Sequence, residues 1–167
     1  MARDILKTLS TEHGKVRSLF EEIKATTDRA EKGRGTLLND ILAALVPHAK
    51  WEELVFYPAF EARADREGLK THAEAVEEHR AVELTVIPDV NKSDLTTPQF
   101  AGRVKVFAEF IDHHAKEEEK TMFKMAREMF SADEREQFDV DYETWKTSST
   151  GKTVVAQAMK EMGARMQ

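Results

Sequence analysis

Six side chains able to bind metal ions recur in this sequence at a fixed spacing. They form two triplets offset by 66 residues, which are His13, His48 and Glu52, then His79, His114 and Glu118. In each triplet the histidines are 35 residues apart, and the glutamate follows the second histidine by four positions. On a helix, a histidine and a glutamate at that spacing lie on the same face, one turn apart. Imidazole and carboxylate donors suit iron or manganese, and carboxylates bridge ions, so the set predicts a two-metal site.

The composition excludes several other kinds of site. The chain of 167 residues has no cysteine, which excludes disulfides, thiolate-bound iron–sulfur clusters and thiol redox catalysis. Its formal net charge of −6 argues against nucleic-acid binding, which depends on clustered lysine and arginine. No apolar run approaches the roughly 20 residues of a membrane span or forms a signal peptide. A cytoplasmic location is therefore expected, without nucleic-acid or membrane partners.

Apolar residues recur every three or four positions in four segments, the pattern of amphipathic helices. The stripes are Leu6, Leu9, His13, Val16, Phe20 and Ile23; Leu38, Ile41, Leu45, His48, Glu52, Val55 and Ala59; Leu69, His72, Val76, His79, Val82 and Val86; and Phe100, Val104, Phe107, Ile111, His114, Glu118, Thr121 and Met125. Short links between these segments favour an all-α, up-down-up-down four-helix bundle. The repeat makes it a pseudo-duplicated pair of helical hairpins.

Glycine and proline residues mark the expected helix ends. Gly33 and Gly35 are expected to close the first helix and separate it from the second. The third helix is expected to stop before Pro88, because proline lacks the backbone N–H of a helical hydrogen bond. Pro98 is a suitable first-turn residue for the fourth helix.

The bundle is expected to occupy residues 1–130, and a C-terminal helical extension residues 131–167. Ser131, followed by acidic residues, is typical of a helix start. The serine- and threonine-rich segment 147–151 indicates a flexible link to a last helix. These additional helices are expected to pack on the bundle or on a partner subunit, as in a homodimer.

The order His, His-x-x-x-Glu, His, His-x-x-x-Glu resembles the hemerythrin-like HHE cation-binding domains, over roughly residues 4–128. That resemblance implies a non-haem di-iron centre, bridged also by an oxo or hydroxo group. The implied ligand groups are His13 and His48 on one iron, His79 and His114 on the other, and Glu52 and Glu118 as bridges. This set leaves a coordination position where dioxygen, hydrogen peroxide or nitric oxide could bind.

Classical oxygen-carrying hemerythrins have a fifth histidine, and one of their carboxylates is an aspartate on a longer spacing. This sequence has two equally spaced glutamates, and its fifth protein ligand is either absent or one of His72, His113 and Tyr142. His72 lies two turns before His79, roughly 10 Å along the helix, which is too far to bind the same ion but is compatible with a role behind the ligands or on the entry path. A more open, symmetric site favours redox chemistry over reversible oxygen carriage.

Acidic residues beside the ligand candidates are expected to face solvent. In the run 117–119 only Glu118 continues the apolar stripe, so Glu117 and Glu119 are expected to turn outward. Glu53 is expected to be exposed or to pair with Lys50.

Two functions fit the chemistry of this site, beside a third interpretation as a metal-stabilised structural bundle whose C-terminal helices recruit a partner. The first is a di-iron oxidoreductase, peroxidase- or catalase-like, that reacts with small oxidants in oxidative or nitrosative stress. The alternative is a non-catalytic module that binds, stores or senses oxygen, nitric oxide or iron. Turnover of hydrogen peroxide would separate the two.

Overall fold

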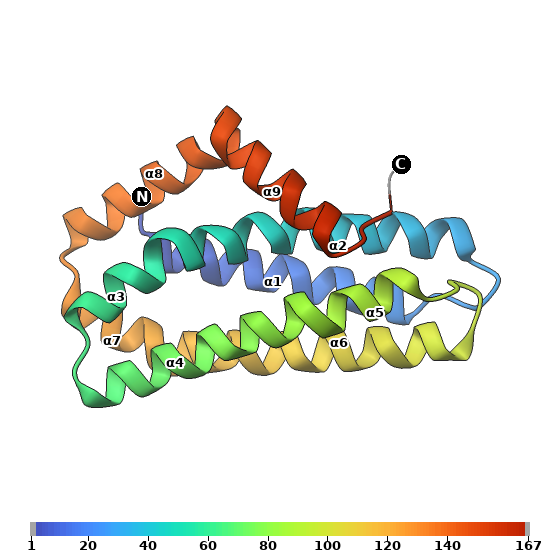
Figure 1. The fold of residues 1–167 in the computed structure, drawn as a ribbon. Coiled ribbons are helices and arrows are strands. Elements are labelled where there is room, and N and C mark those ends of the chain that lie inside the picture. Colours follow the sequence, from blue (N-terminus) through green and yellow to red (C-terminus); the bar gives the residue numbers. More distant parts are fainter. Residues whose placement is uncertain (1–2, 166–167) are drawn as a thin grey trace.

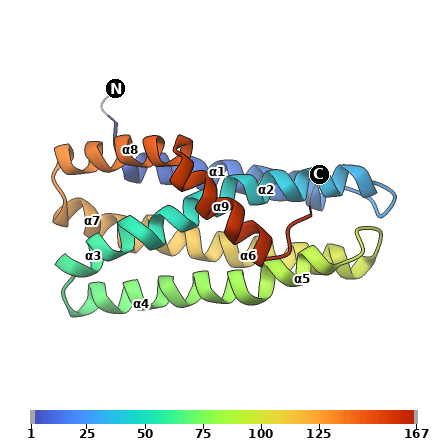
Figure 2. The same cartoon turned by 45° about the horizontal axis from the view of Figure 1, so that its top comes forward.

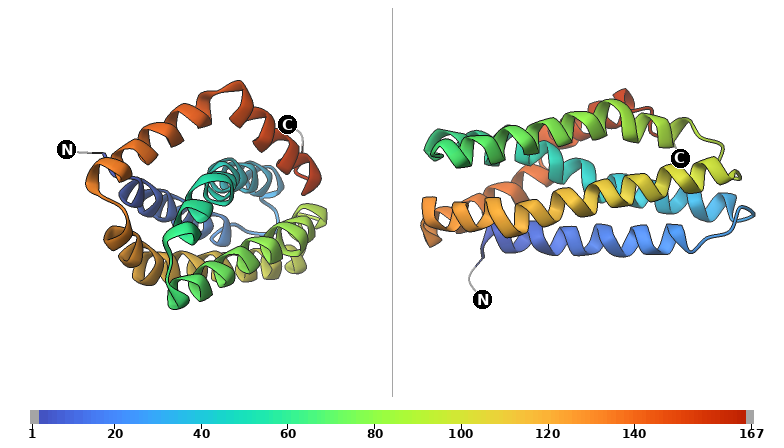
Figure 3. Two further views of the ribbon diagram at one scale, coloured as in Figure 1. Left: turned by 60° about the vertical axis from the view of Figure 1, so that its left-hand side comes forward. Right: turned by 90° about the horizontal axis from the view of Figure 1, so that it is seen from below.

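The computed structural model describes residues 3–165, which form four long helices packed side by side and a two-helix extension (Figure 1). The long helices are α1 (Ile5–Lys24); the run of α2 (Glu31–Trp51), η1 (Glu52–Phe56) and α3 (Tyr57–Arg63); the run of α4 (Arg66–Ala81), η2 (Val82–Val86) and α5 (Ile87–Lys92); and the run of α6 (Pro98–Glu117), η3 (Glu118–Met122) and α7 (Phe123–Met129). Successive long helices run in opposite directions (Figure 3). The predicted up-down-up-down four-helix bundle is confirmed.

The segments labelled η are single π-helical turns, in which the backbone hydrogen bond reaches one residue further than in an α-helix. The extra residue moves the buried face of the second long helix: Val55 and Ala59 were expected inside, but Phe56 and Phe60 are fully buried. In the fourth helix the same shift buries Met122, Phe123 and Ala126 and leaves Thr121 and Met125 half-buried. The apolar stripes predicted for the second and fourth helices are therefore correct up to Glu52 and Glu118, respectively, and wrong beyond them.

The break between the first two helices lies earlier than the glycines predicted. α1 ends at Lys24 and α2 begins at Glu31, so Gly33 and Gly35 lie inside α2. Between them, Arg34 is 3% exposed and its guanidinium donates to the Thr26 hydroxyl and the Leu95 carbonyl. This buried arginine ties both loops at that end of the bundle to the start of α2.

The third helix also continues past its expected end, because Pro88 lies inside α5. The π-helical turn η2 ends two residues before Pro88, as η1 ends two residues before Pro58. Proline has no backbone N–H to donate to the preceding turn. The π-helical turn shifts the hydrogen-bond register at that point, so both helices continue through their prolines. Pro98 begins α6 as predicted, capped by the Thr97 hydroxyl. On the third stripe Leu69 and Val76 are exposed, contrary to prediction.

The C-terminal extension consists of α8 (Ala132–Thr147) and α9 (Ser149–Glu161), which form a V over the bundle (Figures 1 and 2). α8 packs on α1 and α9 on α2. Ser131 caps α8 in a reciprocal capping box with Glu134.

The expected flexible link in the extension is absent. Ser148 alone separates α8 from α9, and its hydroxyl caps the Gly151 N–H. A Cβ atom at Gly151 would lie 2.0 Å from the Trp145 carbonyl oxygen, so the sharp corner requires glycine.

Two apolar clusters fill the bundle. One contains Leu6, Phe56 and Phe60, and the other contains Phe20 and Phe107. The six predicted ligand side chains lie between them. Within residues 3–165, none of the helices combines the length and apolarity of a membrane span.

Candidate metal centre

The six predicted ligand side chains converge between the two apolar clusters, and each is buried or nearly so. Nε2 of His13 lies 3.2 Å from Nε2 of His48. Nε2 of His79 lies 3.0 Å from Nε2 of His114. The histidines therefore meet in the two predicted pairs, each pair joining one hairpin's two helices.

The two glutamates lie between these pairs and reach both. Oε1 of Glu52 is 3.1 Å from His48 Nε2, and its Oε2 is 3.5 Å from His79 Nε2. Oε2 of Glu118 is 3.2 Å from His13 Nε2, and its Oε1 is 3.6 Å from His114 Nε2. Two groups of four donors result, each with one histidine pair and both glutamates, and all donor atoms of a group lie within 4.8 Å of one another.

The donor atoms fit a cation better than they fit one another. Both carboxylate oxygens of Glu52 and Oε2 of Glu118 are buried and make no well-directed hydrogen bond, although a histidine Nε2 lies 3.1–3.5 Å from each of them. Burying carboxylates with so poorly directed partners costs free energy, a penalty that coordination to a metal ion offsets. Four imidazoles and two carboxylates are also a donor set for iron or manganese.

Without a cation, the carboxylates hold protons on the imidazoles. Burial disfavours the charged form of His48, but the nearby Glu52 and the hydrogen bond to Glu12 outweigh it and raise its pKa to about 10. For His114, burial is likewise outweighed by Glu118 and Glu78, and the pKa rises to about 9. The pKa of Glu118 is lowered, because attraction to His114 and His13 exceeds the effect of its burial.

Each ligand histidine has an outer carboxylate on its second ring nitrogen. The Nδ1–carboxylate pairs are His48 with Glu12 at 2.9 Å, His114 with Glu78 at 2.5 Å, His79 with Glu53 at 2.9 Å, and His13 with Glu119 at 2.8 Å. Such partners fix the tautomer and ring orientation of metal-binding histidines, leaving Nε2 free to coordinate.

These outer carboxylates obey the same 66-residue repeat as the ligands. The prediction that Glu119 turns outward is wrong: it lies against α1, where Arg17 donates to it at 3.0 Å. Glu53 pairs with Lys50 at 2.9 Å, as expected, and with His79 as well. Glu117 is exposed, as expected. The matching pairs Glu12/Glu78 and Glu53/Glu119 are the signal by which the sequence could have revealed these roles.

One further side chain lies at the donor cluster and was missed. The Tyr57 hydroxyl donates to Glu118 Oε1 at 2.6 Å and lies 3.0 Å from His79 Nε2 and 3.4 Å from His114 Nε2. Burial, followed by the charges of Glu118 and Glu52, raises the pKa of Tyr57 well above its usual value. The position related by the repeat is Phe123, which has no hydroxyl and whose ring stacks on His13.

The three fifth-ligand candidates lie outside this cluster. The Tyr142 hydroxyl donates to Glu12 at 2.8 Å, one side chain away from His48. His113 is 61% exposed, with Nε2 3.3 Å from Glu78. The His72 ring meets Tyr57 edge-on at 6.1 Å, so it supports Tyr57 rather than the donor atoms.

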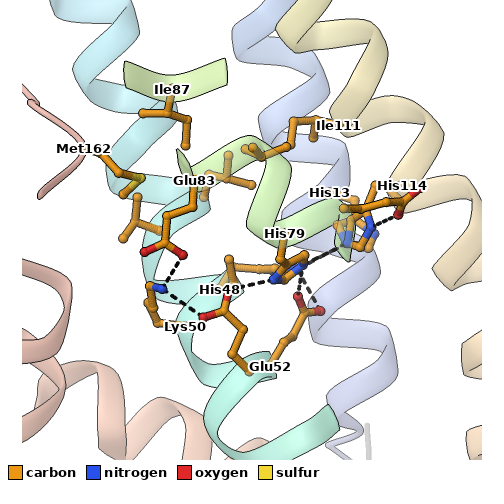
Figure 4. Close-up of a pocket in the computed structure, with 17 residues that line it drawn as sticks. His13, His48, Lys50, Glu52, His79, Glu83, Ile87, Ile111, His114 and Met162 are labelled. Atoms are coloured by element: carbon orange, nitrogen blue, oxygen red, sulfur yellow. Dashed lines mark hydrogen bonds and ion pairs between the residues drawn. The ribbon is translucent and has the colours of Figure 1, made fainter. Parts of the chain in front are cut away.

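A small cavity opens beside the donors (Figure 4). Its volume is about 50 Å³, and its walls include all four histidines and Glu52 together with apolar side chains such as Ile87, Ile111 and Met162. Lys50 donates to Glu83 across one side of it, at 2.6 Å. One water-sized probe needs roughly 10–15 Å³, so the cavity suits molecules of a few atoms.

Comparison with known proteins agrees with this geometry. The chain is 27% identical over 149 residues to a protein named DNA nickase from Nostoc sp. (strain PCC 7120), covering 86% of this chain but 39% of that protein. Its fold resembles the crystal structure of a hemerythrin HHE cation binding domain-containing protein from Mycobacterium kansasii, with a TM-score of 0.73, 21% identity, and 93% and 98% of the two chains covered. The model of the hemerythrin HHE cation binding domain matches residues 4–126. This chain therefore belongs to the hemerythrin HHE cation-binding family.

Proposed function

We propose that this chain binds two iron ions and reacts with a small oxidant, with hydrogen peroxide as the best substrate and nitric oxide and dioxygen as further ligands. The observation that carries the proposal is the pair of overlapping four-donor groups that share both glutamates. The proposed ligands are His13 and His48 for one ion, His79 and His114 for the other, and Glu52 and Glu118 for both. When bound, the two ions supply one-electron redox chemistry and Lewis acidity.

The protein's contribution is to hold neutral imidazoles toward the ions. A ligand histidine must present an unprotonated Nε2, so metal binding releases the protons that the metal-free pairs retain. The outer carboxylates accept the Nδ1 protons and keep each ring oriented.

Tyr57 adds a further oxygen to one half of the donor cluster. Its hydroxyl oxygen lies 3.0 Å from His79 Nε2 and 2.6 Å from Glu118 Oε1. It can serve that half as a fifth donor after losing its proton, or as a hydrogen-bond donor to Glu118 with the proton retained.

The cavity supports a substrate of a few atoms. Its volume of about 50 Å³ beside the histidines suits a molecule of a few atoms. Hydrogen peroxide, dioxygen and nitric oxide all fit this limit. In a catalase-like reaction one peroxide is reduced to water and a second is oxidised to dioxygen, so no further reductant is required.

The decisive experiment adds hydrogen peroxide to the iron-loaded protein in an oxygen-electrode chamber. We expect repeated turnover, with one dioxygen released for every two peroxides consumed. Glu117→Gln, an exposed neighbour of a proposed ligand, should retain this rate, whereas Glu118→Gln should lose it.

A single spectral change without oxygen release or oxidation of an added electron donor would contradict turnover. It would support the non-catalytic binding module instead. A protein that takes up no transition metal would contradict both functions.

DNA cleavage, the activity in the name of the Nostoc relative, is not proposed for this chain. The chain spans 39% of that protein's length, so most of the relative lies outside the match. The net charge of −6 is also unsuited to phosphate backbones.

A further inference from the structure

The C-terminal extension reaches one half of the donor cluster through Glu12. The Tyr142 hydroxyl donates to Glu12 Oε2 at 2.8 Å, and the Lys146 ammonium donates to Glu12 Oε1 at 3.0 Å. Glu12 Oε2 in turn lies 2.9 Å from Nδ1 of His48. Two side chains of α8 thus hold both oxygens of the carboxylate that orients a proposed ligand.

Tyr142 is fixed in this position by its own packing. Its side chain is fully buried, and its ring lies 4.9 Å from the Trp51 ring. The Lys146 ammonium lies 4.1 Å above the Tyr142 ring, a cation–π contact. α8 is itself anchored to the N-terminal region by Arg135, which donates to Asp4 at 2.8 Å.

The carboxylate related by the repeat has no such support from the extension. Glu78 contacts His114 Nδ1 through Oε2 and lies 3.3 Å from His113 Nε2 through Oε1. His113 is 61% exposed, so this partner lies mostly in solvent. The carboxylate that contacts His48 is therefore held by two side chains of the extension, whereas the one that contacts His114 has only an exposed histidine on its other oxygen.

We propose that Tyr142 and Lys146 are positioning residues for a single metal position, the one formed by His13 and His48. By fixing Glu12 they hold the His48 ring with Nε2 toward the ion, so this position binds its cation more tightly and releases it more slowly than it would without the extension. The His79–His114 position does not depend on them. This inference rests on the proposed binding of two metal ions.

The test measures cobalt(II) affinity, by its visible absorption, in proteins with one position disabled. His114→Gln leaves the His13–His48 position, and His48→Gln leaves the other. Tyr142→Phe keeps the ring against Trp51 and removes only the hydroxyl. In the His114→Gln protein we expect Tyr142→Phe to raise the Kd for cobalt(II) about tenfold. That is the low end of the effect of losing a residue that supports a metal ligand. In the His48→Gln protein the Kd should change less than about twofold.

Lys146→Met should act in the same direction as Tyr142→Phe. The matched control is His113→Gln, which should leave the His13–His48 position unchanged. Circular dichroism of the metal-free variants checks folding. If Tyr142→Phe weakens cobalt(II) binding equally at both positions, or at neither, the inference is overturned. One of these two results is expected if Tyr142 contributes only to packing.

A second measurement covers the case in which the single-position proteins do not fold or bind. Cobalt(II) is removed from the otherwise unmodified protein by a chelator, and release is followed in time with and without Tyr142→Phe. We expect two phases, of which one accelerates in the variant; acceleration of both or neither would contradict the proposal. Absence of any bound metal in the unmodified protein would instead contradict the proposed function.

Discussion

The two halves of the donor cluster have the same candidate ligands, two histidines and two shared glutamates, but different surroundings. The His13–His48 half is covered by α8, and the Phe123 ring stacks on His13 there. The His79–His114 half has the Tyr57 hydroxyl in contact with both histidines, and its outer residue His113 is mostly exposed.

The residues that supply metal donors can therefore be told apart from the residues that make the two metal positions different. The repeated residues, including the outer carboxylates, supply two equivalent sets of donors. The unrepeated residues Tyr57 and Tyr142 lie at opposite halves, one inside the donor cluster and one behind it. We therefore expect two inequivalent metal ions, with some residues serving both halves and others serving one.

The largest effect is expected from a residue that both halves share. Glu118→Gln removes a charge from both four-donor groups, so binding of both metal ions should fall by at least the 10- to 100-fold typical of losing even an outer partner. Metal content after desalting measures this loss. Glu117→Gln, one residue away and exposed, is the matched control. Retention of two ions by Glu118→Gln would contradict the bridging role.

Replacing a histidine that belongs to only one four-donor group should remove only one of the two metal ions. His48→Gln and His114→Gln are each expected to leave one metal ion per chain, because each histidine belongs to one group only. Elemental analysis with a protein assay gives the ratio. Loss of both ions in either variant would show that the halves cannot fill separately.

Metal binding should also depend on pH. Without metal, the folded-state pKa values of His48, about 10, and His114, about 9, lie above the usual 6.5. Their contribution to stability is therefore complete below pH 6.5 and is lost as pH rises through those values. Metal affinity should move oppositely, because the ligands must lose these protons.

Melting curves of metal-free and cobalt-loaded protein at pH 6.5 and pH 9 test this pH dependence. The stabilisation by cobalt should be larger at pH 9. A stabilisation that is the same at both values would contradict the assigned protonation states.

The smallest effect on binding is expected from Tyr57→Phe, which gives both halves a phenylalanine at this repeated position. The variant loses a hydrogen bond to a charged group, worth roughly 1.5–3 kcal/mol in metal-free stability. If Tyr57 binds ferric iron, the variant also loses the visible phenolate-to-iron absorption. Phe123→Tyr is the reciprocal change. An identical spectrum before and after Tyr57→Phe would restrict Tyr57 to hydrogen bonding.

Helical periodicity and the repeat both point to the same six positions, and the structure brings these six side chains together. Tyr57 was missed for two reasons. The repeat offers no match, since the related residue is phenylalanine. On a regular α-helix, a residue five positions after Glu52 would point about 140° away from it. The π-helical turn η1 returns Tyr57 to the face of Glu52, and sequence periodicity does not reveal that turn.

The helix ends were harder to predict than the donor positions. Gly33, Gly35 and Pro88 are residues that often end helices, but tertiary contacts override them here. The buried Arg34 holds the start of α2 in place, and the π-helical turn before Pro88 lets the third helix continue. Glu119 was placed in solvent because the position of α1 beside it, with Arg17, depends on the packing of the hairpins.

The most direct test of the central claim is the amount and arrangement of iron in protein loaded anaerobically with ferrous iron and then oxidised. Elemental analysis should give two irons per chain, and X-ray absorption should detect an iron–iron distance with nitrogen and oxygen neighbours. One iron per chain, or two irons without an iron–iron interaction, would contradict a centre in which Glu52 and Glu118 are shared.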